Sequence, residues 1–146
     1  MNKPERRVFA SQHEKLNREI DRIQGREFRS PAPEAGIAAV DLERAIGAFR
    51  TSLREHFAFE ESEEGGYLRQ VIAARPTLKK SVERLLADHG AILAALADLE
   101  LASRANQSSA TIKSRFVNTV RHLRHHESEE MELLQHALMD DIGVCD

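Results

Sequence analysis

The 146-residue sequence predicts an all-α protein, folded as an antiparallel up-down-up-down four-helix bundle. Three observations favour this class. Apolar residues recur at alternating steps of three and four over four long segments. No segment shows the alternating pattern of a strand, and the seven Gly and four Pro residues gather mostly between the periodic segments. Four such stripes predict helices that share one core and pack near-parallel, at roughly 20°.

Composition narrows the classes of function. The length predicts one domain over residues 1–146, and the formal net charge of −3 comes without a basic patch. No apolar run approaches the ~18 residues of a spanning helix, and the first residues lack the apolar segment of a secretory signal. Cys145 is the single cysteine, so an intrachain disulfide framework is excluded. We therefore expect a cytoplasmic protein with neither nucleic acid nor membrane as a partner.

The first helix is predicted over residues 8–24, after a polar N-terminus at residues 1–7. Gly25 is the expected stop, and two prolines within residues 26–37 exclude a regular helix there. One histidine interrupts the otherwise apolar stripe. The stripe is Phe9, His13, Leu16, Ile20 and Ile23.

The second helix is predicted over residues 38–64, with Gly65-Gly66 ending it in the left-handed conformation. Residues 67–74 are expected to add one or two helical turns. The last two positions of this stripe hold a histidine and a carboxylate, where Leu or Ile is usual. The stripe is Leu42, Ile46, Phe49, Leu53, His56 and Glu60.

The third helix is predicted to begin at Pro76, because proline fits the first turn. Its stripe again holds one histidine: Leu78, Val82, Leu85, His89, Ile92, Leu96 and Leu99. Residues 103–109 are a polar loop, in which Ser108 or Ser109 is the expected N-cap of a fourth helix over residues 110–139.

The fourth helix offers two faces that could carry ligands. The face through His126 and Glu130 is largely apolar elsewhere, whereas the face through His125 and Glu129 is polar throughout. Periodicity selects the first pair for the core and leaves the second as the alternative. The apolar face is Ile112, Phe116, Thr119, Leu123, His126, Glu130, Leu133 and Ala137.

Six ligand-type residues therefore interrupt four apolar stripes: His13, His56, Glu60, His89, His126 and Glu130. With a helical rise of ~1.5 Å per residue, all six can share one layer of about 10 Å, nearer one end of the bundle than its middle. Buried carboxylates need a strong partner, and two cations would supply it. Six ligands exceed the four of a tetrahedral zinc site, and mixed nitrogen and oxygen ligation of a paired site favours iron over Mn or Zn.

At these residues the chain resembles the hemerythrin-like, HHE cation-binding family, over about residues 8–140. The matching pieces are His13, His56-Phe57-x-x-Glu60-Glu61 followed by Gly65-Gly66-Tyr67-Leu68, Asp88-His89, and His126-Glu127-x-x-Glu130 followed by Leu133-Leu134. The resemblance implies an oxo- or hydroxo-bridged di-iron centre. The terminal ligands it implies are His13, His56, His89 and His126, and the bridging carboxylates are Glu60 and Glu130.

One departure separates the chain from the oxygen-carrying members of this family. Those members have a second histidine one turn after the first in the third helix, where this chain has Leu93, and they space the fourth-helix carboxylate, an Asp, one residue further. The chain is more similar to members with one histidine there, such as the iron-sensing domain of a ubiquitin-ligase subunit. This difference counts against reversible O₂ carriage.

The sequence therefore predicts a non-haem di-iron protein that binds or senses O₂, or handles iron, more readily than an enzyme. The alternatives are a di-metal oxidoreductase acting on peroxide or nitric oxide, and a metal-free helical interaction module. Other polar residues are expected to be solvated or incidental: Glu61, Glu63, Glu64, Glu127, Glu129, His122, His125, His136 and Cys145. Glu61 has an outer contact to a ligand as its alternative role. Tyr67 either covers the open end of the metal layer, donates a hydrogen bond to a ligand residue, or simply packs.

Overall fold

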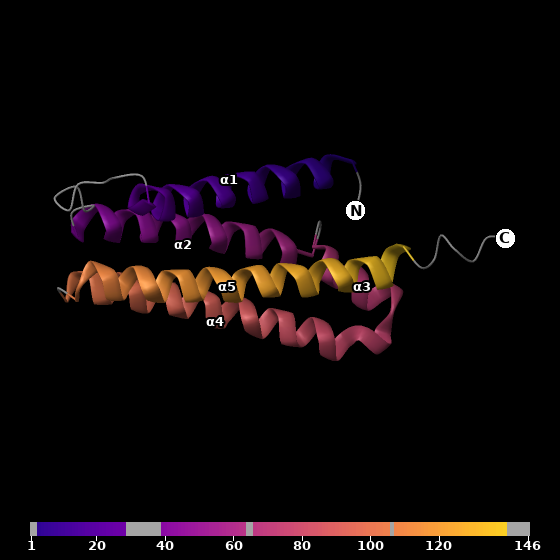
Figure 1. Ribbon diagram of the computed structural model, residues 1–146. Coiled ribbons are helices and arrows are strands. Elements are labelled where there is room, and N and C mark those ends of the chain that lie inside the picture. The colour runs from indigo at the N-terminus through magenta and orange to yellow at the C-terminus, as the bar shows by residue number, and fades with distance from the viewer. Residues whose placement is uncertain (1–2, 29–38, 64–65, 106, 140–146) are drawn as a thin grey trace.

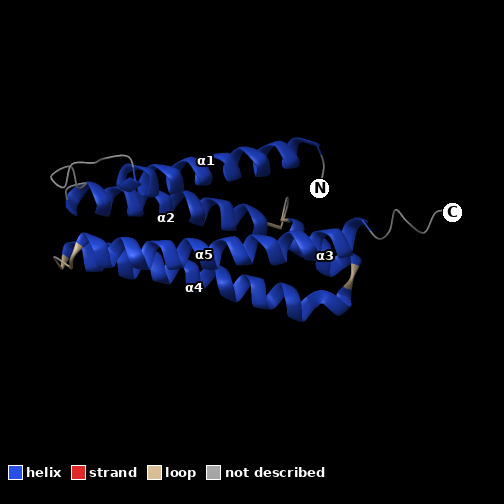
Figure 2. Ribbon diagram, viewed as in Figure 1, coloured by secondary structure: helices blue, strands red, loops and turns tan. Residues whose placement is uncertain are grey.

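The computed structural model describes residues 3–28, 39–63, 66–105 and 107–139, and helices dominate these ranges, with no strand among them (Figure 2). The predicted all-α bundle is confirmed. The long helices are α1 (Lys3–Phe28), α2 (Ala39–Glu61), α4 (Lys79–Arg104) and α5 (Ser109–Leu134). The shorter elements are α3 (Tyr67–Ala74), the 3₁₀ turn η1 (Pro76–Leu78) and the π-helical turn η2 (Gln135–Met139).

The four long helices run up and down alternately, and their order around the bundle is α1, α2, α4, α5 (Figure 1). Each contacts the next, and α5 returns to contact α1. Helix α3 lies at the end of the bundle where α1 begins and α5 ends. The bundle is therefore antiparallel, with one short helix inserted between its second and third long helices.

Several predicted boundaries were wrong. Helix α1 begins at Lys3 and ends at Phe28, so it extends beyond the predicted 8–24 at both ends. Near its start, Arg6 and Arg7 are exposed polar residues, which add nothing to the apolar stripe. Gly25 lies inside the helix, where glycine costs only about 1 kcal/mol relative to alanine. The proline-containing connection and Cys145 lie outside the described residues.

Three other local predictions were confirmed, and one was wrong. Residues 67–74 form α3, and Pro76 begins the 3₁₀ turn that leads into α4. Ser108 is the N-cap of α5, because its hydroxyl accepts a hydrogen bond from the Thr111 amide at 3.2 Å. Gly65 lies outside the described residues, and Gly66 has a φ of −69°, so it does not adopt the predicted left-handed cap.

Two separate apolar clusters form the core. The larger, which we call the main core, fills most of the bundle and is built from side chains such as Leu16, Leu53, Ile92 and Leu123. The smaller, which we call the end core, lies around α3: Tyr67, Leu68, Val71, Val82, Leu85, Leu133 and Ala137, with Phe9 packed against it. Among the described residues, no helix has both the length and the apolar character needed to cross a bilayer.

Candidate metal centre

The six predicted residues lie together between the two apolar clusters. On α1, His13 falls between Phe9 of the end core and Leu16 of the main core, and on α4 His89 falls between Leu85 and Ile92 in the same way. Five of the six are at most 2% exposed: His56, Glu60, His89, His126 and Glu130. His13 is the exception, with a side chain 23% exposed. The structure thus gathers these residues into one polar layer with apolar packing on both sides, which we call the ligand layer.

Two histidine–glutamate pairs are formed within single helices. On α2, His56 Nε2 lies 2.7 Å from a carboxylate oxygen of Glu60, and on α5, His126 Nε2 lies 2.8 Å from Glu130. Both pairs are spaced i, i+4, so both side chains project from one face of their helix. The four side chains thus point into the same layer.

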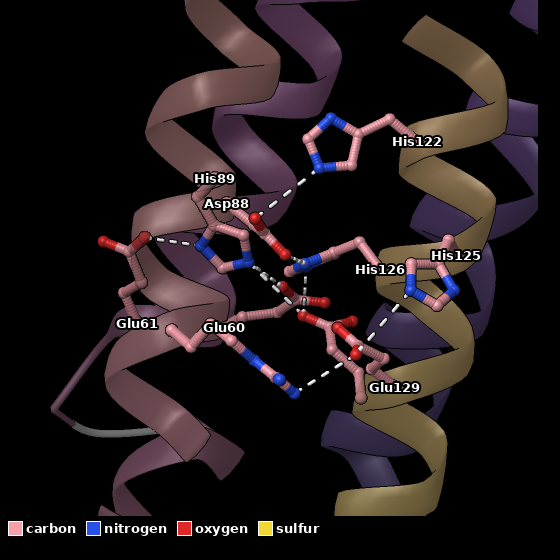
Figure 3. Close-up of polar contacts among 10 residues, drawn as sticks. Glu60, Glu61, Asp88, His89, His122, His125, His126 and Glu129 are labelled. Carbon is pink, nitrogen blue, oxygen red and sulfur yellow. Dashed lines mark hydrogen bonds and ion pairs between the residues drawn. The ribbon is translucent and has the colours of Figure 1, made fainter. Parts of the chain in front are cut away.

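His89 joins the two pairs across the bundle. Its Nε2 atom lies 3.3 Å from an oxygen of Glu60 and 3.3 Å from an oxygen of Glu130. The two glutamates therefore share a neighbour on α4, and the layer is continuous across three helices (Figure 3).

Ligand atoms cluster into two groups, each with all its atoms within 4.8 Å of one another. One group is Glu60, His89, His126 and Glu130, and the other is His13, His56 and Glu60. Glu60 belongs to both and offers two carboxylate oxygens. The arrangement therefore fits two neighbouring cations that share one carboxylate.

Unsatisfied polar atoms mark the same place. Within the described residues, five buried side-chain atoms form no hydrogen bond of acceptable geometry. Three of them belong to the ligand layer, His13 Nε2 and both Glu60 oxygens, and a fourth is the hydroxyl of Tyr67 in the end core. The fifth is Glu19 Oε2. A buried polar atom without a partner costs roughly 1–3 kcal/mol. Three of these atoms, one imidazole nitrogen and two carboxylate oxygens, can coordinate a cation. A bound cation would therefore satisfy them, and the residues present fit a metal.

Protons take the place of cations in the metal-free layer. Burial lowers the pKa of His89, but hydrogen bonds to Glu130, Glu60 and Glu61 outweigh it and raise this pKa to about 10. His126 follows the same pattern, because Glu130 overcomes the effect of burial and raises the pKa. Burial would raise the pKa of Glu130, but hydrogen bonds from His126 and His89 hold it below its usual range. Glu130 is therefore charged, and its charge favours the protonated forms of His89 and His126.

His13 behaves differently from these histidines. Burial, followed by the proximity of His56, lowers its pKa. The ring is therefore neutral at pH 7, as a metal ligand must be.

Each of the four histidines in the ligand layer also has an outer partner at Nδ1, and the four partners form a ring around the bundle. Each partner lies on the previous long helix around the bundle, in the order α1, α2, α4, α5 and back to α1. On that helix it is adjacent in sequence to a residue of the ligand layer. In order, the contacts are Gln12 of α1 to His56 of α2 (3.0 Å), Glu61 of α2 to His89 of α4 (2.6 Å), Asp88 of α4 to His126 of α5 (3.5 Å) and Glu127 of α5 to His13 of α1 (3.6 Å). Such contacts orient the imidazoles, so that Nε2 would face a bound metal.

The outer partners were only partly foreseen. The outer role considered for Glu61 agrees with its contact to His89 (Figure 3). Glu127 was expected to be solvated, which was wrong, because it contacts both His13 and Arg124 and its side chain is 17% exposed. Gln12 and Asp88 were missed. The signal that could have found them is their place directly before a ligand histidine, on the flank of a core-facing stripe.

The competing face of α5 lies outside the layer. His125 is 74% exposed in its side chain, and it pairs with Glu129, which also binds Arg84 at 3.1 Å. His122 contacts Asp88 at 3.5 Å (Figure 3) and has a side chain 43% exposed. These residues form a solvent-facing network around the layer rather than part of it.

Tyr67 opens α3 directly over the ligand layer. Its side chain is fully buried, and its ring packs edge-on against Phe9, with centroids 5.7 Å apart. Burial, and then the charges of Glu60 and Glu130, raise its pKa. The hydroxyl is thus near both carboxylates, although it forms a hydrogen bond of acceptable geometry with neither.

The comparison with known families agrees with this geometry. The model of the hemerythrin HHE cation-binding domain matches residues 6–138. No curated protein and no solved structure matched the chain. The matched range includes every residue of the ligand layer and the four long helices, apart from the first three residues of α1. The buried histidine–glutamate cluster fits the cation site that the family name describes. The chain therefore belongs to the hemerythrin HHE cation-binding domain family.

Proposed function

We propose that this protein is a non-haem di-iron protein that binds or senses O₂, or handles iron. The observation that carries the proposal is the pair of ligand groups joined by Glu60. Four imidazoles and two carboxylates suit iron, because mixed nitrogen and oxygen ligands satisfy its borderline character. A pair of iron ions held here would supply the electrons that O₂ chemistry requires.

The residues of the chain have separable roles in this proposal. Five residues would hold the ions from all four long helices, and Glu60 would bridge the ions. The five are His13, His56, His89, His126 and Glu130. The outer ring of Gln12, Glu61, Asp88 and Glu127 would orient the imidazoles. The end core covers one side of the layer and the main core covers the other, so bulk water is kept away from the ligands.

The test is an optical and metal analysis of the purified protein. We expect protein loaded with iron to carry about two Fe per chain and to change its visible spectrum when reduced without oxygen and then exposed to air. The double variant His56→Ala with Glu130→Ala should carry none. Iron-free protein with full structure and no visible absorption after iron loading would contradict the proposal.

A di-metal oxidoreductase acting on peroxide or nitric oxide is the second candidate, favoured by one observation. The position one turn after His89 is Leu93, which packs against the main core and supplies no ligand. Fewer protein ligands leave more coordination positions for a substrate. Rapid peroxide turnover by the reduced protein would favour this function, and stable O₂ binding without turnover would favour the first.

A metal-free interaction module remains the alternative from another class of protein. It would require equal melting temperatures with and without a chelator. The cytoplasmic location and the lack of nucleic-acid partners stay predictions.

A further inference from the structure

The two ligand groups are unequal, and the poorer one lies beside Tyr67. The group around His89 has four residues, whereas the group of His13, His56 and Glu60 has three. Phe9 connects this poorer group to Tyr67, because its ring centroid lies 4.3 Å from that of His13, 5.5 Å from that of His56 and 5.7 Å from that of Tyr67. The Tyr67 ring is thus one aromatic side chain away from the group that lacks a fourth protein ligand.

Apolar packing alone does not explain the Tyr67 hydroxyl. Within the described residues, this buried hydroxyl forms no hydrogen bond of acceptable geometry, and the same holds for His13 Nε2 and both oxygens of Glu60. A phenylalanine would fill the same apolar space without burying an unsatisfied oxygen. The His13 and Glu60 atoms belong to the ligand layer and the Tyr67 hydroxyl borders it, so one bound partner would satisfy all of them.

The backbone brings Tyr67 to this place through a close approach at Gly66. A Cβ atom built on Gly66 would lie 2.2 Å from the Ser62 carbonyl oxygen and 2.5 Å from that of Glu60. Only glycine allows the chain to pass so close to the end of α2. The turn therefore fixes the start of α3, and with it Tyr67, against the residue that both ligand groups share.

We propose that Tyr67 is a metal ligand, and that its phenol oxygen completes the group formed by His13, His56 and Glu60. On binding, the O–H bond breaks, the phenolate oxygen coordinates the cation, and the proton is released to solvent. The bound pair would then have seven protein ligands, with four residues around each ion when Glu60 is counted for both. This inference rests on the proposed metal pair, but not on iron binding O₂.

The sequence makes the test unusually specific, because Tyr67 is the single tyrosine of the chain. Any phenolate signal from the iron(III) protein must therefore come from it. We expect resonance Raman spectra of the iron-loaded protein to show phenolate ring vibrations, enhanced through a phenolate-to-iron charge-transfer band. The variant Tyr67→Phe should lose these vibrations and that band.

Two controls keep the test independent of folding and of the proposed function. Metal-free Tyr67→Phe should unfold at the same temperature as metal-free wild type or higher, because it loses only an unsatisfied hydroxyl. Adding Leu101→Tyr to Tyr67→Phe restores one tyrosine at an exposed position of α4, and it should not restore the signal. Iron is counted in every sample.

The possible results separate the two claims. Wild type that binds iron without phenolate vibrations would overturn the role of Tyr67 and leave the proposed function standing. A Tyr67→Phe variant that keeps the wild-type spectrum would lead to the same conclusion. Failure of wild type to bind any metal would overturn the proposed function, and the ligand role with it.

Discussion

The Nδ1 atom of His89 lies 2.6 Å from a carboxylate oxygen of Glu61, the shortest of the four outer contacts to the histidines of the ligand layer. This contact joins α4 to the end of α2. Since Nδ1 is occupied, Nε2 is the atom left to face Glu60 and Glu130. The pair thus places an anionic partner behind an imidazole that we propose binds metal, which raises the basicity of that ligand.

The variant Glu61→Gln should weaken metal binding. The amide keeps the size of the side chain but removes the negative charge, and loss of such an outer partner typically costs 10–100-fold in affinity, by order of magnitude. Titration against a competing chelator measures the change. Glu63→Gln is the control, because its side chain is 83% exposed and pairs with Arg69 on the surface. Equal affinities in the two variants would contradict this role of Glu61.

Neighbouring histidines on α5 should differ sharply. His126→Ala removes a fully buried ligand residue and leaves Glu130 short of its closest partner, so metal content should fall by about one ion per chain or more. His125→Ala removes a largely exposed side chain and should leave the metal content unchanged. Metal analysis of both variants decides between the two faces of the helix. Loss of metal in His125→Ala alone would select the competing face.

Metal-free protein should lose stability as the pH rises above neutrality. The pKa of His89 is raised from 6.5 to about 10, so its contribution is fully present below pH 6.5 and is lost as the pH approaches about 10. His126, whose pKa is also raised, acts in the same direction. Chemical unfolding at several pH values, with a chelator present, measures this effect.

Metal-loaded protein should respond to pH in the opposite way over the same range. Higher pH removes the protons that compete with the cations, so metal binding strengthens. The difference in unfolding free energy between loaded and metal-free protein should therefore grow above pH 6.5. Parallel pH profiles for the two forms would show that the protons and the metal do not occupy the same layer.

Removing the metal should lower the melting temperature. A ligand present at about 1,000 times its dissociation constant stabilises the folded state by about 4 kcal/mol, and the carboxylates of the layer lose their cations when it is removed. Thermal unfolding followed by circular dichroism, with and without chelator, gives the shift. Addition of metal should restore it, and an unchanged melting temperature would support the metal-free alternative.

The variant Gly66→Ala should disturb α3 and the layer beneath it. The added Cβ meets backbone oxygens of Ser62 and Glu60, which cannot move as a flexible side chain can. Overpacking of this kind costs roughly 1–3 kcal/mol. We expect a lower free energy of unfolding and weaker metal binding, whereas Gly90→Ala is the control, since its Cβ would meet nothing within 4 Å. Equal stabilities of the two variants would contradict the close approach.

The sequence was sufficient to predict the fold and the layer for a physical reason. Long helices repeat every 3.6 residues, so a buried face leaves a regular stripe, and a ligand such as His56 or His89 is visible as an interruption of that stripe. Helix ends carry a weaker signal. Helix α1 runs from Lys3 to Phe28, beyond its apolar stripe, because only residues on a buried face leave a periodic pattern in the sequence.

The outer ring could not be predicted in the same way. Gln12 and Asp88 lie on the flanks of the stripes, where polar residues are ordinary, and their partners belong to other helices. Which flank faces which histidine depends on the rotation of each helix in the bundle. The position of Tyr67 depends on the turn at Gly66, whose geometry arises from contacts with α2 rather than from its own φ.

The most direct test of the central claim is the number of metal ions bound per chain in an anaerobic titration with ferrous iron, for wild type and for Glu60→Ala. Because Glu60 belongs to both ligand groups, we predict two ions for wild type and fewer than one for the variant. Wild type that binds no metal, or a variant that still binds two ions, would contradict a metal pair built around this carboxylate.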